Sequence, residues 1–388
     1  MRGAVLGREL VRLDDPDGYL RLARSLVAGD GLRINGRLTA YRPPLYPILL
    51  APWVWACDGP GLPRALAAFH LGLGALTVGL VVDAARRWGL GRSACWVAAT
   101  VAAADPVLVV QVRSLMTETL AACLLAGAAW GFTLRGGRGA AAGGLGLGLA
   151  ALCRPSLLPV ALLTAAAGLV GGPIPFKDRL TWALTVLVAT LAVLCPWAIR
   201  NARVLGEPVW TTTHGGYTLA LANNPAYYAD VLDGPPGAVW SGPNQAAWFR
   251  WVDAATAGLP ELESDRLLRR AAVDLARAEP ARFARATAAR LGRFWGLVPA
   301  SAVYPGPLRW ATAAWALPVF VLAAIGATRP VARRHGHRVA IAAVVALTIV
   351  HAAYWTDLRM RAPLVPALAL LAGAGFRPSG RPRREAAK

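Results

Sequence analysis

The chain has 388 residues, 56% of them hydrophobic, a formal net charge of +20 and a mean hydropathy of +0.45. Soluble domains are usually about 45–50% apolar, so this composition excludes an ordinary soluble protein. Repeated apolar runs of about 18 residues instead predict a polytopic helical membrane protein. Because the basic residues lie in short loops between these runs, where they set topology, we expect membrane lipids and no nucleic acid as partners.

Residues 1–63 form a polar opening region. It carries three carboxylates, Asp14, Asp15 and Asp17, followed by a Pro-rich turn at Pro43 and Pro44. Carboxylates beside a membrane domain are costly when buried and inexpensive in water, so we place this region in the external aqueous layer. The apolar segment 45–57 is too short to cross a core of about 30 Å, and its tryptophans and prolines favour an interfacial or re-entrant helix.

The next part of the chain, 64–199, predicts six membrane spans at 64–83, 93–104, 119–134, 140–152, 156–170 and 180–199. Residues 200–307 hold no run long enough to span and predict an external domain. Within it, 264–298 predicts two helices broken at Pro280, with Ser264 as the N-cap of the first. Three further spans, 308–328, 339–355 and 363–376, precede a basic tail, 377–388.

The distribution of charge orients these nine spans. Every dense basic loop, together with the tail, falls on one side, which we assign to the cytoplasm. The acidic opening region and the domain 200–307 then lie outside. This topology leaves the N-terminus outside with nothing to carry it across, so we expect a further transmembrane helix upstream of the acidic opening.

The sequence contains no recognisable metal or cofactor motif. Its five cysteines form no CxxC pair, and there is no HExxH. We therefore expect no metal and no cofactor, with Asp15 and Asp17 left as a weak alternative for a divalent ion.

Four stretches resemble a known group of enzymes. Asp15-Pro-Asp-Gly-Tyr19-Leu-Arg-Leu-Ala23 resembles the pattern that opens the first external loop of bacterial GT-C glycosyltransferases, and Arg42-Pro-Pro-Leu-Tyr-Pro47 resembles the motif that closes it. The segments 196–225 and 357–366 are similar to the family's entry into its external domain and to the stretch before its last helix. Within the superfamily, the chain resembles the protein mannosyltransferases and the aminoarabinose transferase.

The resemblance implies a fold and a reaction. The fold is an all-α polytopic membrane protein, a GT-C-like bundle of about nine spans with a mostly helical external domain. The reaction moves a sugar from a polyprenyl-phosphate donor to a glycan, lipid or protein acceptor, at the external (periplasmic) face of the inner membrane. The donor and acceptor are thus the expected partners, and inversion in a single displacement is the expected course.

The resemblance also implies catalytic residues. Asp15 matches the family's catalytic acid residue and would take the acceptor proton as a general base. The alternative is that Asp15 caps a helix beginning near Gly18. Asp14 and Asp17 are alternatives as the base or its partner. Glu118, where the second external loop meets a span, is a second candidate, although a Glu at a helix start also favours the helix dipole.

The departing lipid phosphate requires cations at the external face. Arg359 and Arg361 are the first candidates, and Arg42, Arg113 and Arg200 follow; for all five the alternative is snorkelling to lipid headgroups. The remaining candidate substrate-binding residues are Tyr19, Tyr46 and His351. For His351 the alternative is a packing role in its span.

Two other functions are compatible with a polytopic protein of this composition. One is a transporter or flippase of lipid-linked sugars, which would commonly show internal repeats with broken helices. We find no such repeat and few charges within the spans. The other is a non-catalytic membrane scaffold, which the missing first helix favours and the intact Asp loop disfavours.

Overall fold

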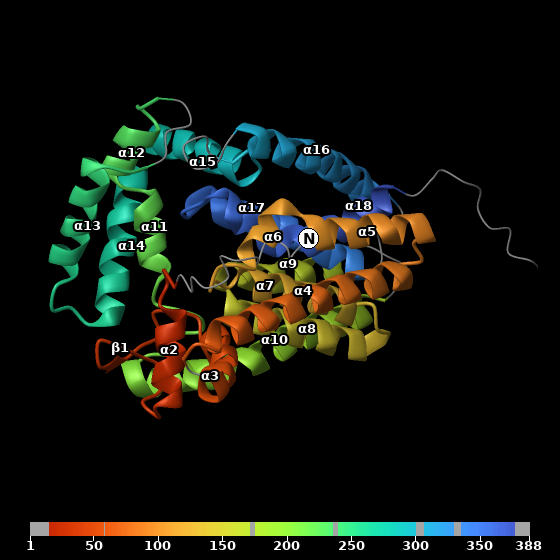
Figure 1. Ribbon diagram of the computed structural model, residues 1–388, viewed down its shortest axis with the longest axis horizontal. Coiled ribbons are helices and arrows are strands. Elements are labelled where there is room, and N and C mark those ends of the chain that lie inside the picture. The colour runs from red at the N-terminus through yellow and green to blue at the C-terminus, as the bar shows by residue number, and fades with distance from the viewer. Residues whose placement is uncertain are drawn as a thin grey trace, which may run out of the picture.

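The computed structural model describes residues 15–57, 59–170, 175–235, 240–299, 306–329 and 335–376. Asp14 and the basic tail 377–388 lie outside the described residues. Figure 1 shows a bundle of long helices, with a smaller group of helices at one end of it. The N-terminal segment packs beside this end, between the two groups.

A helix lies at each of the nine predicted spans, as the fold class requires. These nine are α4 (Leu62–Arg87), α5 (Arg92–Ala104), α7 (Glu118–Gly131), α8 (Gly136–Cys153), α9 (Leu158–Leu169), α10 (Phe176–Leu205), α16 (Gly306–Thr328), α17 (His335–Ala353) and α18 (Val365–Gly375). Among the described residues, five segments are long and apolar enough to cross a membrane: Leu62–Arg87, Arg92–Gln111, Phe176–Leu205, Arg309–Thr328 and Gly336–Ala353.

The centre of the bundle is α18, in which every residue is buried. Its close neighbour is α16, and glycine allows the approach: a Cβ added to Gly326 would lie 1.9 Å from the Leu371 carbonyl oxygen. On the outside, α10 exposes leucine and valine side chains such as Leu184 and Val188. Apolar residues inside and outside are what a helix bundle in lipid requires.

The external group consists of α11 (Gly215–Ala222), α12 (Pro225–Val231), α13 (Pro243–Thr256), α14 (Glu261–Ala278) and α15 (Pro280–Phe294). It has its own aromatic core, which includes Tyr227 and Trp248. The predicted break at Pro280 is confirmed. The predicted cap at Ser264 is wrong, because α14 begins three residues earlier, directly after the extended Pro260. At the other boundary, α10 continues past residue 200 to Leu205.

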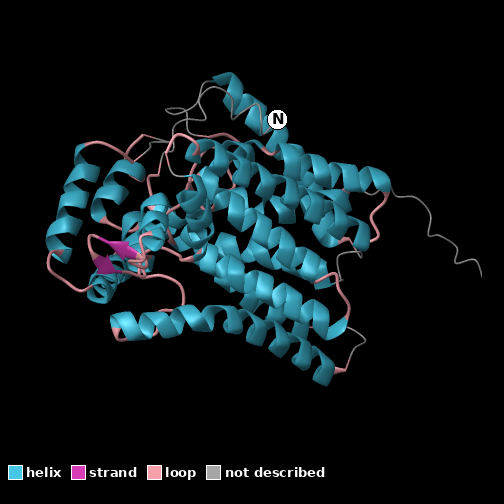
Figure 2. Ribbon diagram, turned by 60° about the horizontal axis from the view of Figure 1, so that its bottom comes forward, coloured by secondary structure: helices cyan, strands magenta, loops and turns pink. Residues whose placement is uncertain are grey.

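The N-terminal segment contains α2 (Tyr19–Val27), a two-stranded hairpin of β1 (Arg33–Ile34) and β2 (Arg37–Leu38), and α3 (Leu45–Cys57). Figure 2 shows the hairpin in magenta beside the external helices. Its turn is Asn35-Gly36, with φ of 50° and 77°, as a tight hairpin turn requires. This hairpin was not predicted from the sequence, although Asn-Gly is its usual signal.

Short helices join the spans on the same side. They are α6 (Pro106–Gln111) and the 3-10 helices η1 (Pro155–Leu157) and η3 (Leu358–Leu364). Since α6, η1 and η3 lie at the end of the bundle that carries α2 and the external group, the polar residues of several distant segments meet there.

Candidate functional site

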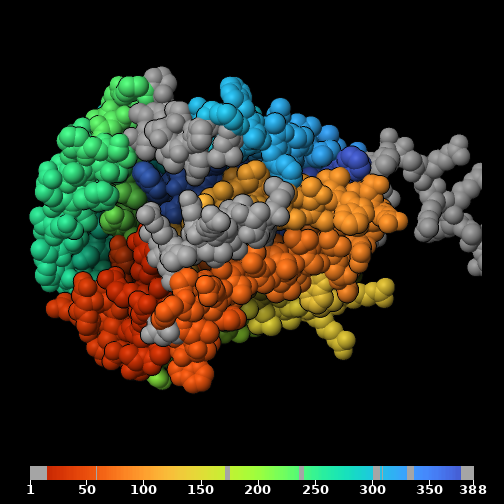
Figure 3. Space-filling model, in the orientation of Figure 1, coloured from red at the N-terminus to blue at the C-terminus, as the bar shows by residue number. Residues whose placement is uncertain are grey.

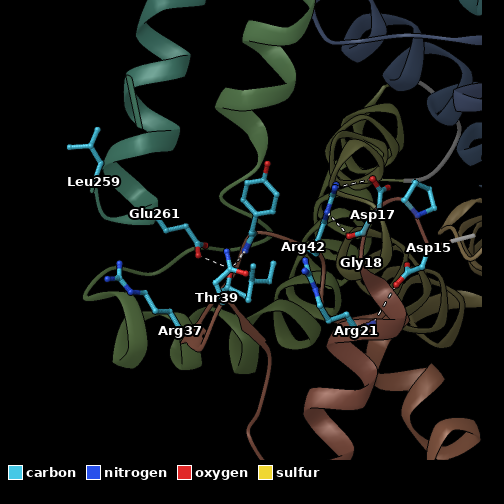
Figure 4. Close-up of a pocket in the computed structure, with 13 residues that line it drawn as sticks. Asp15, Asp17, Gly18, Arg21, Arg37, Thr39, Arg42, Leu259 and Glu261 are labelled. Carbon is cyan, nitrogen blue, oxygen red and sulfur yellow. Dashed lines mark hydrogen bonds and ion pairs between the residues drawn. The ribbon is translucent and has the colours of Figure 1, made fainter. Parts of the chain in front are cut away.

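An open cleft of about 950 Å³ lies where the N-terminal segment meets the external helices. Figure 3 shows this meeting on one face of the molecule, with the N-terminal segment in red and the external helices in green. Charged residues of both signs line the cleft, as Figure 4 shows: Asp15, Asp17, Arg21, Arg37, Arg42 and Glu261. The fold therefore brings Asp15, Asp17 and Arg42, three of the predicted site residues, to one wall.

Asp15 caps α2. Its Oδ1 accepts a hydrogen bond from the backbone N–H of Tyr19 at 2.7 Å, and its Oδ2 accepts from Leu20 at 2.9 Å and Arg21 at 3.3 Å. The predicted helix start near Gly18 is confirmed, and so is the capping interaction. Partial burial raises the pKa of Asp15 above its usual value, although the three backbone N–H groups oppose this effect.

Asp17 is paired with Arg42. The Arg42 Nη2 lies 2.8 Å from the Asp17 Oδ1, and the Arg42 Nε donates to the Asp17 carbonyl oxygen at 3.1 Å. The Arg42 guanidinium also lies over the ring of Tyr41, 5.3 Å from its centroid. Arg42 thus joins the residues just before α3 to those just before α2.

The two motif tyrosines anchor this loop to the bundle. Tyr19 is buried and contacts Tyr46 edge to face, with ring centroids 5.2 Å apart. Tyr46 is fully buried, and its hydroxyl lies 2.8 Å from His70 Nε2. Neither side chain is among the described residues that line the cleft. Their contacts position Asp15 and Asp17, and a direct substrate contact stays a prediction.

Glu261, at the start of α14, holds the external group against the loop. Its Oε1 accepts from the Ala40 N–H at 2.9 Å and from the Thr213 hydroxyl, and its Oε2 accepts from the Thr39 hydroxyl at 2.6 Å. Arg200 supports the same loop segment by donating to the Thr39 carbonyl oxygen at 2.8 Å. This places Arg200 in a structural contact beside the cleft.

His214 adds a neutral ring at this junction. Its ring contacts Tyr41 edge to face, with centroids 4.3 Å apart. Burial, together with the nearby positive charge of Arg42, holds the pKa of His214 well below its usual value. His214 is therefore uncharged at neutral pH.

A second acidic residue lies deeper, at the end of the bundle. Glu118 begins α7 and is fully buried, and the Arg154 Nη1 lies 3.1 Å from its Oε1. The same Arg154 nitrogen donates to the Thr117 hydroxyl at 3.1 Å. Arg154 was not among the predicted site residues. A buried carboxylate requires a cationic partner, and an arginine at the external end of a span is the signal that would have found it.

Arg359 and Arg361 are two residues apart but have different surroundings. Arg359 is bound through its Nε to the Asp357 carboxylate at 3.1 Å, and it interacts electrostatically with Glu118 and Asp17. Arg361 is buried and donates to the carbonyl oxygens of Phe294 at 3.1 Å and Gly296 at 2.9 Å. Arg359 thus lies near the acidic residues, whereas Arg361 stabilises the end of α15.

The two remaining candidates do not line the cleft in the described part of the chain. His351 is buried, stacks on Phe294 with centroids 4.8 Å apart, and has its Nδ1 2.9 Å from the Thr356 hydroxyl. This arrangement matches the packing alternative. Arg113 follows α6, and its substrate role stays a prediction. No group of three or more His, Cys, Asp or Glu among the described residues is placed to hold a metal ion.

Comparison with known proteins shows the fold. No family model and no curated protein matches the sequence. The oligosaccharyltransferase of Archaeoglobus fulgidus, solved with a tethered acceptor peptide, is similar with a TM-score of 0.52 and 15% identity; the match covers 94% of this chain and 45% of that one. The chain has the GT-C fold. At this identity the likeness extends to the GT-C fold alone.

Two structures of ArnT from Cupriavidus metallidurans are similar more weakly. The apo form matches with a TM-score of 0.41 and 17% identity, over 96% of this chain and 75% of that one. The form bound to undecaprenyl phosphate matches with a TM-score of 0.43 and 15% identity, over 97% of this chain and 76% of that one. Both TM-scores are too low to support conclusions about this chain.

Proposed function

We propose that the protein is an integral membrane glycosyltransferase that moves a sugar from a polyprenyl-phosphate donor to a glycan, lipid or protein acceptor. One observation carries the proposal: in a GT-C fold, three carboxylates and several guanidinium groups share one open cleft at the polar end of an apolar bundle. General-base chemistry needs the carboxylates, and a phosphate leaving group needs the cations.

In this proposal Asp15 is the general base. A carboxylate has about four lone-pair sites, and backbone N–H groups occupy three of those of Asp15, which leaves one for a substrate hydroxyl. The pKa of Asp15 is raised by burial, which makes it a stronger base than an ordinary aspartate. Capping and catalysis are compatible, because the cap also fixes the carboxylate in place.

The proposed reaction is a single displacement. The acceptor oxygen bonds to the anomeric carbon as the bond from that carbon to the phosphate oxygen breaks, and Asp15 takes the hydroxyl proton. The configuration of the sugar inverts. The lipid phosphate leaves as an anion, which nearby guanidinium groups stabilise.

Arg359 is the best-placed cation for the leaving phosphate. Its Nε is bound to Asp357, but its two terminal nitrogens have no hydrogen bond within the described residues. Arg42 is paired with Asp17, and Arg154 is paired with Glu118. In this proposal these two arginines contribute positive charge to the site without binding the phosphate directly. Glu118 in this scheme acts on the phosphate only indirectly, through its ion pair with Arg154.

The proposed location is the inner membrane, with the cleft on its external side. The basic residues Arg86, Arg87 and Arg92, at the junction of α4 and α5, lie at the opposite end of the bundle from the cleft (Figure 1). Cytoplasmic loops are rich in such residues. The external helices would then cover the cleft, as Leu259 and Glu261 do on one wall.

Sugar transfer in membranes tests this proposal. The full chain, its Asp15→Asn variant and the control Asp30→Asn would receive a mixture of radiolabelled polyprenyl-phosphate sugars. Asp30 is an exposed acid of the same loop that lies outside the cleft. Transfer by the wild type and the control but not by Asp15→Asn is the expected result. Movement of labelled lipid across the bilayer without transfer would instead favour the transporter alternative and overturn the proposal.

A further inference from the structure

The cleft has unused hydrogen-bond donors. Its three carboxylates already have partners inside the protein: backbone N–H groups bind Asp15, Arg42 binds one oxygen of Asp17, and the loop and Thr213 bind Glu261. In contrast, Arg21 and Arg37 are exposed in the same cleft. In the part of the chain that the structure describes, neither guanidinium group has an ion pair or a hydrogen bond.

These two arginines come from different elements that meet at the cleft. Arg21 extends from the first turn of α2, where its Nη2 would lie 3.2 Å from a Cβ added to Gly18. Arg37 extends from β2, just after the Asn35-Gly36 turn. Figure 4 shows both side chains in the cleft, Arg21 on the side of Asp15 and Asp17 and Arg37 on the side of Glu261. A guanidinium fork without a partner suits a phosphate or carboxylate group, which it can bind through two parallel hydrogen bonds.

Their position relative to the bundle separates them from the lipid donor. Residues 180–199 of α10 are predominantly apolar, and Arg200, at the polar end of this run, binds the Thr39 carbonyl oxygen beside the hairpin. The hairpin therefore lies at or beyond the water side of the membrane. The deeper cations, Arg359 and Arg154, lie near Glu118 on the bundle side of Asp17. A polyprenyl chain must stay with the apolar helices, so its phosphate fits the deeper group.

We propose that Arg21 and Arg37 form a subsite for an anionic group, a phosphate or a carboxylate, carried by a glycan acceptor. This inference rests on the proposed function and narrows its acceptor class. The acceptor would enter from the water side, place its anion on the two arginines and present a hydroxyl to Asp15. The donor phosphate would approach from the bundle side.

Binding measurements test the subsite without requiring transfer. The full chain in phosphatidylcholine nanodiscs would be titrated with glucose 1-phosphate, glucuronate and glucose, which share a six-membered sugar ring and differ in charge. We expect both anions to bind at least tenfold more tightly than glucose, with an affinity that falls as salt rises. The double variant Arg21→Gln with Arg37→Gln should lose this preference. Asp15→Asn should keep it, so a failure of catalysis and a failure of the subsite give different results.

Two control variants remove an arginine without touching the subsite. Arg33 lies in the same hairpin, but its guanidinium is bound to the carbonyl oxygens of Asp30 and Gly36 at 2.8 and 2.7 Å. Arg277, on α14, is 78% exposed and does not line the cleft. Arg33→Gln and Arg277→Gln should bind the anions as the wild type does.

Three results would overturn the proposal. The first is equal binding of glucose and the anions by the wild type. The second is an anion preference that survives in the double variant. The third is loss of sugar-anion binding when anionic phosphatidylglycerol replaces phosphatidylcholine in the nanodiscs, because the occupant would then be a lipid headgroup.

Discussion

Replacing Asp15 by Asn converts one carboxylate oxygen into an amide and removes the proposed base, while one acceptor remains at the start of α2. The Asn oxygen can still accept from Tyr19, and the bonds from Leu20 and Arg21 to the other oxygen are lost. Losing part of a cap costs about 1 kcal/mol of folding stability. Losing a general base lowers turnover by about 10²–10⁴, which is roughly 3–5 kcal/mol in the activation barrier.

The two effects can be separated, because the expected loss of turnover is much larger than the loss of stability. Initial rates of sugar transfer and thermal unfolding would be measured on the same preparations of wild type, Asp15→Asn and Asp15→Ala. Asp15→Ala removes both acceptor oxygens and should unfold at a lower temperature than Asp15→Asn. Both should be inactive. Turnover of Asp15→Asn within about threefold of the wild type would refute the base assignment and leave Asp15 as a cap only.

Three further predictions concern the same region. The pKa of Asp15 is raised, so on acidification its carboxylate is protonated at a pH above the ordinary aspartate value of about 3.9. The rate of transfer should therefore fall as the pH is lowered through this range. A rate independent of pH down to about 4 would contradict a raised pKa in the base. Arg154→Met should destabilise the protein by about 3–5 kcal/mol by leaving buried Glu118 unpaired, and adding Glu118→Gln should recover part of this loss in thermal unfolding; no recovery would exclude their pairing as the cause. Glu261→Gln should weaken the contact between the loop and the external helices by about 1–3 kcal/mol. The expected readout is faster hydrogen exchange of the Ala40 N–H, and unchanged exchange would rule out this role for Glu261.

Some parts of the site could be predicted because they depend on neighbouring residues. The motif around Asp15 predicts a carboxylate just before a helix, and a capping contact spans only a few positions, so both the helix and the cap are found. The break at Pro280 is equally local, because proline suits the first position of a helix, where its missing N–H has no partner to lose, and Pro280 begins α15. The start of α14 was misplaced because Ser264 is a good cap by type, while Pro260 decides the actual boundary.

Other parts depend on contacts between distant segments, which no local pattern records. Glu261 was not predicted as part of the site because its partner Ala40 is 221 positions away. Arg359 and Arg361 looked equivalent, but one faces the acidic residues and the other the end of α15. Arg154 was not predicted as a site residue, and only the fold places it beside Glu118.

The sequence by itself determined the membrane class, the positions of nine helices and the polar loop with Asp15, because the hydrophobic effect and helix capping act on short stretches of chain. Only the tertiary structure decided which charges are paired and which are unpaired. Pairing depends on distances of a few ångströms between segments far apart in sequence, and it is this pairing that leaves Arg21 and Arg37 with unused donors in the cleft.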